Sequence, residues 1–304
     1  MELPTHVRYR VRVTFFAQSW PQACTASARG LLVCWFLTSC TAAGGDLAPA
    51  DDAGGAGETT GEGPPERCLE AIPSPILVPA GPFTMGCDSF GEELPCYNDE
   101  QPAHLVTLDT FRIDATEVTV GSYRECVAAG ACKEPADVSN ADCNYPHPQR
   151  VHRPVNCVTW SDAVAFCAFA GGRLPTEAEW EKAARGDDER IFAWGNEPPT
   201  CDHANFSGCS PSSMAVGCHP AGLSAYGAHD MAGNVAEYVS DWFDNTWYSR
   251  SPADNPVGPK SGEHRGARGG SYYDFNHFQR ATFRGGHDPS DTPFDYIGFR
   301  CAYE

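Results

Sequence analysis

The chain has 15 cysteines and 10 histidines among its 304 residues, and both residue types can act in catalysis or bind metals. No two cysteines are three positions apart, so the thioredoxin-type redox motif and the zinc-ribbon motif are both absent. The chain also lacks a P-loop, a G-x-G-x-x-G motif and an H-E-x-x-H motif. The GGSYY run at 269–273 lacks the final glycine of a serine-hydrolase nucleophile elbow. These absences exclude the common nucleotide-binding, zinc-protease and serine-hydrolase sites.

The first 40 residues resemble a bacterial export signal. Residues 31–37 (LLVCWFL) form an apolar run that is too short for a membrane-spanning helix of ~20 residues but suits the core of a signal peptide. Cys40 follows in the run LTSC, which resembles a bacterial lipobox whose cysteine is acylated. We expect residues 1–39 to be a lipoprotein signal peptide and Cys40 to carry a lipid anchor in the bacterial envelope. An ordinary signal peptide with an unrelated cysteine is the alternative.

Residues 40–67 are rich in glycine, alanine, proline and acidic residues, and Leu47 is their only large aliphatic residue after the anchor position. Such a segment cannot bury enough apolar surface to offset the entropy lost on ordering, so it predicts a flexible tether.

The many cysteines of the chain indicate an oxidising compartment. Without Cys24, Cys34 and Cys40, twelve cysteines remain, an even number that is consistent with six disulfides. The local pairs that we expect are Cys87–Cys96, Cys126–Cys132 and Cys143–Cys157.

The composition of the whole chain narrows the class of protein. Its formal charge of −19 opposes binding to a phosphate backbone, so nucleic acid is not an expected partner. Its 30 glycines and 25 prolines are a larger share than the average of about 12% and indicate a loop-rich fold. Hydrophobic residues make up 41% of the chain, which is enough for a substantial core. The composition thus predicts a folded, loop-rich and acidic body.

The elements that must position any site are predicted by periodicity and capping. Residues 76–85 predict a strand with turns, and residues 104–114 alternate apolar and polar side chains as a second strand does. Residues 119–129 and 161–170 predict helices, the first capped by Thr119. A capping box from Thr176 to Glu179 opens a third helix that ends at Gly186. The last hundred residues show no helical period, so we expect one α+β domain over residues 68–304.

Seven blocks within this body carry a family resemblance. They are VPAGPFTMG (78–86), RIDATEVTVGSY (112–123), RPVNCVTWSDAVAFCAFAGGRLPTEAEWEKAARG (153–186), FAWGN (192–196), AYGAHDMAGNVAEY (225–238), RGGSYY (268–273) and IGFRCA (297–302). In this order they resemble the sulfatase-modifying factor family, whose founding activity is that of the formylglycine-generating enzyme. The GRLPTEAEWE run at 172–181 is long enough to be very specific. The resemblance implies a C-type-lectin-like α+β fold with little regular secondary structure.

The resemblance also implies bound calcium. One calcium site of the family uses a side-chain oxygen, two backbone carbonyls and a glutamate, and its positions match Asp230, Gly233, Val235 and Glu237. Calcium takes several oxygen ligands, so a short loop with acidic ends suits it. An acidic turn in which Glu237 is merely solvated is the alternative. A second, weaker site would use Asn205 and the carbonyl of Phe206, but its acidic half has no counterpart before Val216.

The catalytic pair of the family does not map onto this chain. The family's oxidase holds Cu(I) between two thiolates soon after the RGGSY block, where this chain has Asp274 and then residues 275–279. No cysteine lies between Cys218 and Cys301, and a carboxylate does not replace a thiolate on Cu(I), so copper is not expected. A cysteine from the group at positions 201, 209 and 218 could still fold into the gap. A tryptophan that the active enzymes carry in the calcium loop is Ala236 here.

Two functions follow from this resemblance. The first is a binding or accessory protein that uses the family groove, with Ser271, Asp274 and Arg284 as groove candidates and no oxidase activity. The second is an oxidoreductase with a replacement metal site of the two-histidine-one-carboxylate type, for which Asp274, His277 and His287 are the candidate ligands. The expected ligand is a peptide, a protein or a glycan, the only membrane contact is the lipid anchor, and we expect a monomer.

The family's disulfide pattern adds one long-range prediction. The family pairs the cysteine of its second helix with the cysteine of the C-terminal GFRC strand, and these positions are Cys167 and Cys301 here. A second family bridge is absent because its helix position is Ala184.

Overall fold

The computed structural model describes residues 68, 74–91, 94–136, 140–287 and 293–304. The expected signal peptide at 1–39, the lipidation site Cys40 and the tether at 40–67 lie outside the described residues. Within the described part of the chain, no helix is both long enough and apolar enough to cross a membrane.

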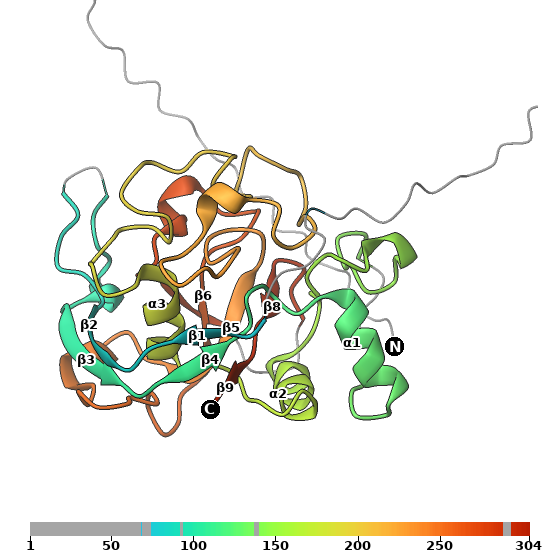
Figure 1. The fold of residues 1–304 in the computed structure, drawn as a ribbon, viewed down its shortest axis with the longest axis horizontal. Helices are drawn as coiled ribbons and strands as arrows, with labels where there is room; N and C mark the ends of the chain where they lie inside the picture. The colour runs from blue at the N-terminus through green and yellow to red at the C-terminus, as the bar shows by residue number, and fades with distance from the viewer. Residues whose placement is uncertain (1–67, 69–73, 92–93, 137–139, 288–292) are drawn as a thin grey trace, which may run out of the picture. The chain divides into compact units, whose positions relative to one another are not determined.

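The described residues form a loop-rich α+β fold, as the sequence predicts, with short strands and three α-helices (Figure 1). The strands are β1 (Ile76–Val78), β2 (Gly81–Met85), β3 (His104–Leu108), β4 (Phe111–Ile113), β5 (Ala236–Phe243), β6 (His264–Arg268), β7 (Arg284–His287), β8 (Ile297–Phe299) and β9 (Ala302–Tyr303). The α-helices are α1 (Val120–Ala128), α2 (Trp160–Phe169) and α3 (Glu177–Arg185). The 3₁₀ helices are Asn98–Glu100, Pro148–Arg150, Pro220–Gly222, Trp247–Arg250 and Asn276–Gln279.

The strands are arranged in three small sheets. The largest has the order β7-β6-β5-β8, in which only the β5–β8 pair is parallel. The second has the order β1-β4-β9, and the third is the antiparallel pair β2-β3. The four-stranded sheet therefore places β8 directly beside β5, which contains Glu237, and β7 beside β6.

Each of the two strands expected near the start of the body is divided into two. Val78 pairs with Phe111 and Gly81 pairs with Leu108. The break between β1 and β2 therefore lies opposite the break between β3 and β4. Pro79, which lies at the interruption, has no N–H to donate to a strand ladder. Gly81 has φ of 137°, a backbone conformation that other residues rarely adopt. The chain can therefore change sheets between β1 and β2.

The three expected helices are confirmed, and local caps explain their limits. Thr119 accepts a hydrogen bond from the backbone N–H of Ser122 and caps α1. Thr159 makes a capping box at the start of α2, one residue earlier than expected. Thr176 and Glu179 make the predicted capping box of α3, which ends at Gly186 with φ of 72°.

The core consists of two clusters of buried side chains. One surrounds Trp180 of α3, which packs against β2, β3, β5 and β6. The other joins α1 and α2 to β8 through Tyr123, Phe166 and Phe299. All nine residues of α3 are buried, including its charged ones. Burial of charged side chains requires partners of opposite charge. Arg268 and Arg284 are such partners for the glutamates of α3.

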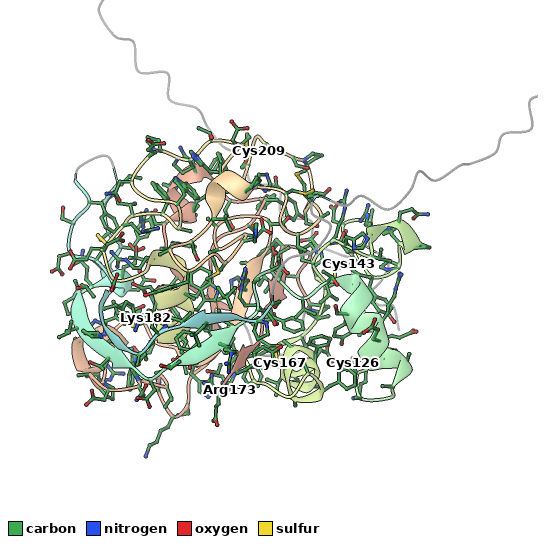
Figure 2. All side chains as sticks on the ribbon, in the orientation of Figure 1. Cys126, Cys143, Cys167, Arg173, Lys182 and Cys209 are labelled. Carbon is green, nitrogen blue, oxygen red and sulfur yellow. A yellow bond between two sulfur atoms is a disulfide. The ribbon has the colours of Figure 1, made fainter. Side chains whose placement is uncertain are left out.

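Six disulfides join the twelve cysteines of the described residues, and Figure 2 labels several of these cysteines. All three local pairs expected from the sequence are present, as Cys87–Cys96, Cys126–Cys132 and Cys143–Cys157. Cys167 of α2 is bonded to Cys301, 134 residues later. Two further bonds, which the sequence left unassigned, are Cys68–Cys218 and Cys201–Cys209.

Candidate functional site

A pocket of about 330 Å³ lies over the four-stranded sheet, at the position of the expected groove. Strands β5, β6 and β7 form its floor, and the loop that follows β6 forms one wall. The residues of its lining that matter most are Ala236, Arg268, Tyr273, Asp274, His287 and Tyr296. Ala236, at the position that matches a tryptophan in the resembled active enzymes, contributes only a methyl group to this lining.

Asp274, the residue at the first thiolate position, lies in this pocket. The buried hydroxyl of Ser271 donates a hydrogen bond of 2.7 Å to Asp274 Oδ2. The backbone N–H of Ser207 donates to the carbonyl of Asp274 at 2.9 Å. Ser271 is therefore a positioning residue for the carboxylate, which two segments of the chain hold in place.

Arg284, the third groove candidate, lies inside the protein. Its Nε and Nη2 atoms donate to the two carboxylate oxygens of Glu177 at 2.7 and 2.6 Å. Beside it, Arg268 Nη2 lies 2.5 Å from Glu181 Oε2. Burial alone would raise the pKa of Glu181, but Arg268 and Arg185 outweigh burial and lower it. These ion pairs stabilise α3 under the pocket, and Arg284 has no free donor directed into it.

His287 is the titratable neighbour of Asp274 in the pocket. Burial lowers the pKa of the His287 imidazole, the charge of Asp274 acts in the opposite direction, and His264 lowers the pKa further. The net effect favours the neutral form of the imidazole. Among the described residues, Asp274 forms no ion pair with a lysine, arginine or histidine.

The three candidate ligands of a replacement metal site do not gather. Asp274 and His287 share the pocket, but His277 stacks on Phe275, packs against Phe278 and is not part of the lining. Among the described residues, the one group of three potential ligands whose donor atoms all lie within 4.8 Å is Cys87, Cys96 and Glu100.

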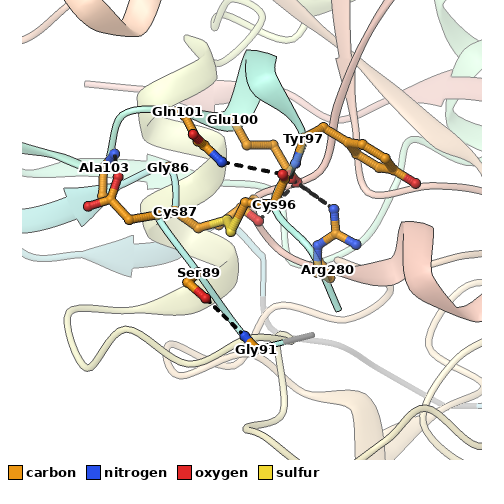
Figure 3. The surroundings of a disulfide bond; sticks show 12 residues. Gly86, Cys87, Ser89, Gly91, Cys96, Tyr97, Glu100, Gln101, Ala103 and Arg280 are labelled. Carbon is orange, nitrogen blue, oxygen red and sulfur yellow. Dashed lines mark hydrogen bonds and ion pairs between the residues drawn. A yellow bond between two sulfur atoms is a disulfide. The ribbon is translucent and has the colours of Figure 1, made fainter. Parts of the chain in front are cut away.

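That group is a disulfide beside a saturated carboxylate (Figure 3). Glu100 accepts two hydrogen bonds from Arg280 at 2.9 and 2.8 Å, and others from Tyr97 N and the Thr282 hydroxyl. With both sulfurs bonded to each other and the carboxylate neutralised by Arg280, the group is structural.

The expected calcium loop leads into β5, whose first residue, Ala236, lines the pocket. Asp230, Gly233 and Asn234 all have positive φ, which glycine, asparagine and aspartate tolerate best. A Cβ at position 233 would lie 2.3 Å from the carbonyl oxygen of Asn205, so only glycine fits there. Asp230 Oδ2 accepts a hydrogen bond of 2.6 Å from the backbone N–H of Gly217.

Glu237, the other acidic residue of this loop, is fully buried and has three hydrogen bonds. Arg300 donates to its two oxygens at 2.6 Å each, from Nε and Nη2. The indole N–H of Trp180 donates to Glu237 Oε2 at 2.7 Å. Arg300 thus neutralises one of the carboxylates of this region.

A third carboxylate, Glu117, completes an acidic cluster that sequence reasoning missed. Burial raises the pKa of Glu117 well above its ordinary value, and the charges of Asp230 and Glu237 raise it further. Its Oε1 accepts from the Asn234 side chain at 2.8 Å, whereas its Oε2 is buried with no hydrogen-bond partner. The conspicuous TEVT run inside one of the family blocks could have drawn attention to Glu117.

Asn205, expected in the second calcium site, is also buried with an unpaired oxygen. Its side-chain nitrogen donates to the carbonyl of Ser212 at 3.0 Å, and its Oδ1 has no hydrogen-bond partner. Its backbone carbonyl accepts from Asn234 at 2.8 Å, which joins this segment to the first calcium loop. The two expected calcium loops are therefore neighbours.

Comparison with known proteins gives three informative matches. Residues 61–304 match the family described as the sulfatase-modifying factor enzyme 1-like domain. Over 282 residues the chain is 33% identical to the formylglycine-generating enzyme of Streptomyces coelicolor, with 75% of this chain and 88% of that protein covered. Over 262 residues it is 35% identical to the hercynine oxygenase of Mycolicibacterium smegmatis, with 75% of this chain covered. The chain spans only 61% of that relative's length.

A solved structure is also similar to this chain. The structure of PvdO from Pseudomonas aeruginosa superposes with a TM-score of 0.64 and 30% identity, covering 75% of this chain and 93% of that one. Together with the elements described above, this match confirms the loop-rich, C-type-lectin-like α+β fold that the sequence blocks imply.

Proposed function

The chain belongs to the sulfatase-modifying factor family, and from this premise we propose that it is a binding or accessory member rather than a formylglycine-generating oxidase. Its ligand, of the peptide, protein or glycan class, would bind in the pocket beside Asp274. In this proposal the protein is exported and acts at the cell envelope, where the lipid on Cys40 anchors it.

One observation carries the proposal: every cysteine of the described residues is in a disulfide. A Cu(I) site of the family type needs two thiolates beside the groove, because Cu(I) prefers soft sulfur ligands. Cys201, Cys209 and Cys218, the candidates to fill the gap, are all bonded to other cysteines. The residue at the groove is Asp274, so the residues present do not fit copper.

Calcium is the metal that the residues fit. Glu117 Oε2 and Asn205 Oδ1 are buried without a hydrogen-bond partner among the described residues. The carboxylates of Glu117, Asp230 and Glu237 share the charge of Arg300, and His219 Nδ1 lies 3.7 Å from Asp230 Oδ1. In our proposal Asp230 and the carbonyls of Gly233 and Val235 hold the ion. Glu237, the fourth expected ligand, has both oxygens bonded to Arg300 and therefore contributes less to the site. Asn205 and the Phe206 carbonyl would serve a second, weaker site. The role of the ion would be to neutralise buried negative charge.

The compartment follows from the disulfides. Six disulfides in one domain indicate an extracellular or otherwise oxidising location. Anchoring through Cys40 is the finer part of the proposal, and it rests on the lipobox-like run at 37–40.

The alternative, an oxidoreductase with a replacement metal site, has less support. It would need His277 to join Asp274 and His287, and these three residues do not form a ligand cluster. Metal analysis of the purified protein separates the two functions, because calcium alone supports the binding protein whereas stoichiometric iron supports the enzyme.

A direct assay tests the loss of oxidase activity. The full-length protein is incubated with Cu(I), oxygen and a peptide that contains C-x-P-x-R. The mass of the peptide product is then measured by mass spectrometry. A formylglycine-generating enzyme serves as the positive control, and copper without protein serves as the blank. We expect the thiol mass to persist. Conversion of the thiol to an aldehyde above the blank would overturn the proposed function.

A further inference from the structure

The charges that line the pocket beside Asp274 do not balance. Among the described residues, Arg268 is the only guanidinium in the lining. Its Nη1 and Nη2 atoms donate to Glu181, Glu177 and the carbonyls of Ala281 and Thr282, and its Nε is buried without a hydrogen-bond partner. Burial lowers the pKa of His287, which favours its neutral form. Asp274 therefore contributes a negative charge that forms no ion pair with any described residue of the pocket lining.

The geometry of Asp274 leaves this charge available to a ligand. Ser271 donates to Oδ2 at 2.7 Å and fixes the orientation of the carboxylate. The side chain is half-buried at the pocket wall, so it is partly removed from water. A carboxylate in such a position attracts a cation more strongly than one on the open surface, because the local dielectric constant is lower.

Aromatic rings surround the carboxylate. Tyr273 and Tyr296 stack with their centroids 6.3 Å apart and their planes at 23°, and Phe283 also lines the pocket. Tyr273 is 73% exposed, and Phe275 beside it is 64% exposed. Exposed aromatic side chains at a hollow mark a binding surface, and the faces of such rings attract ammonium and guanidinium groups.

We propose that the pocket recognises an organic cation, a guanidinium or ammonium head group that donates hydrogen bonds to Asp274 and packs on Tyr273 and Tyr296. This inference rests on the proposed function, because it names the ligand of that groove. A neutral glycan could also stack on these rings, but it would leave the charge of Asp274 uncompensated. The volume of about 330 Å³ suits one side-chain-sized head group.

Two probes of nearly the same shape test the charge requirement. N-acetyl-arginine methylamide carries the guanidinium, and its citrulline counterpart replaces the guanidinium by a neutral urea. Each is titrated into the full-length protein by ligand-observed NMR. We expect the citrulline probe to bind about tenfold more weakly or worse. Butylguanidine, as a third probe, distinguishes a free small cation from an arginine side chain on a peptide, which would bind more tightly through its backbone.

Three variants locate the effect. Asp274→Asn keeps the shape and should abolish the preference for arginine over citrulline. Ala236→Trp should fill the pocket and weaken both probes. Asp202→Asn is the matched control, because Asp202 is exposed and outside the pocket lining, yet the variant removes the same charge from the chain.

The outcomes separate the inference from the function on which it rests. Equal binding of the two matched probes, or an unchanged preference in Asp274→Asn, would overturn the cation and leave the binding function in place. Binding of a methyl glycoside without any binding of the arginine probe would assign the groove to glycans instead. Failure of every cationic probe to bind the wild-type protein also refutes the inference. Formylglycine formation in the separate assay would overturn the proposed function, whatever these titrations show.

Discussion

Removing the long disulfide should cost far more stability than removing a short one. Cys167 and Cys301 are separated by 134 residues, whereas Cys126 and Cys132 are separated by 6. In the chain-entropy model these bonds stabilise the fold by about 5 and about 2 kcal/mol, because a longer loop restricts the unfolded chain more. All four cysteines are buried, so double replacement by alanine removes similar packing in the two cases.

The assay is equilibrium unfolding in guanidinium chloride without reductant. Cys167→Ala/Cys301→Ala should lose about 3 kcal/mol more than Cys126→Ala/Cys132→Ala. Its m-value should also rise more, since an unfolded chain without the long bond exposes more surface. Free-thiol titration of both variants checks that the other five disulfides remain.

Equal losses in the two variants would refute the reasoning from loop length. A larger loss in the Cys126 and Cys132 variant would do so more strongly, and would indicate that native packing around α1 dominates. An m-value that stays the same in both variants would show that the unfolded state is not restricted by the bonds in the way assumed.

Three further predictions concern calcium, pH and anchoring. Chelation of calcium should lower the melting temperature by about 5–10 °C if the ion is present at ~100 times its dissociation constant; Asp230→Ala should abolish that response, and a melting temperature indifferent to chelator would remove the calcium site. Burial and, after it, the charge of Glu177 raise the pKa of Asp241 from 3.8 to about 7. The folded state therefore holds this proton more tightly than the unfolded state does. The free energy of unfolding should fall by about 4 kcal/mol as the pH rises from about 4 to about 7. Asp241→Asn should flatten this part of the pH–stability curve in urea unfolding, and an unchanged slope would contradict the assignment. Cys40→Ser should move the protein to the soluble fraction or stop its export, whereas an unchanged membrane fraction at the same yield would contradict the lipid anchor.

Local features of the fold could be predicted from the sequence because their causes lie within a few residues. Thr119 and Thr176 cap helices through N–H groups three residues away, and Gly186 ends α3 because it adopts positive φ. The short disulfides follow similarly from cysteines that are close in the chain. The family blocks also predicted two features that depend on distant parts of the chain, the position of the groove and that of the GFRC strand.

The composition of the pocket depended on contacts that spacing does not reveal. Asp274 and His287 come together because β6 pairs with β7, whereas His277 turns onto its aromatic neighbours. Arg284 matches a groove position in sequence, yet it lies inside the protein because Glu177 supplies the opposite charge there.

The family, the three helices and the lack of cysteine between positions 218 and 301 could all be read from the sequence. Which charges are neutralised and which stay available depends on the packing of distant segments. Glu237 is paired with Arg300 across 63 residues, while Glu117 Oε2 is left without a hydrogen-bond partner. The physical reason is that the energy of a buried charge depends on the groups that distant segments bring within a few ångströms, and the order of residues does not show which segments those are.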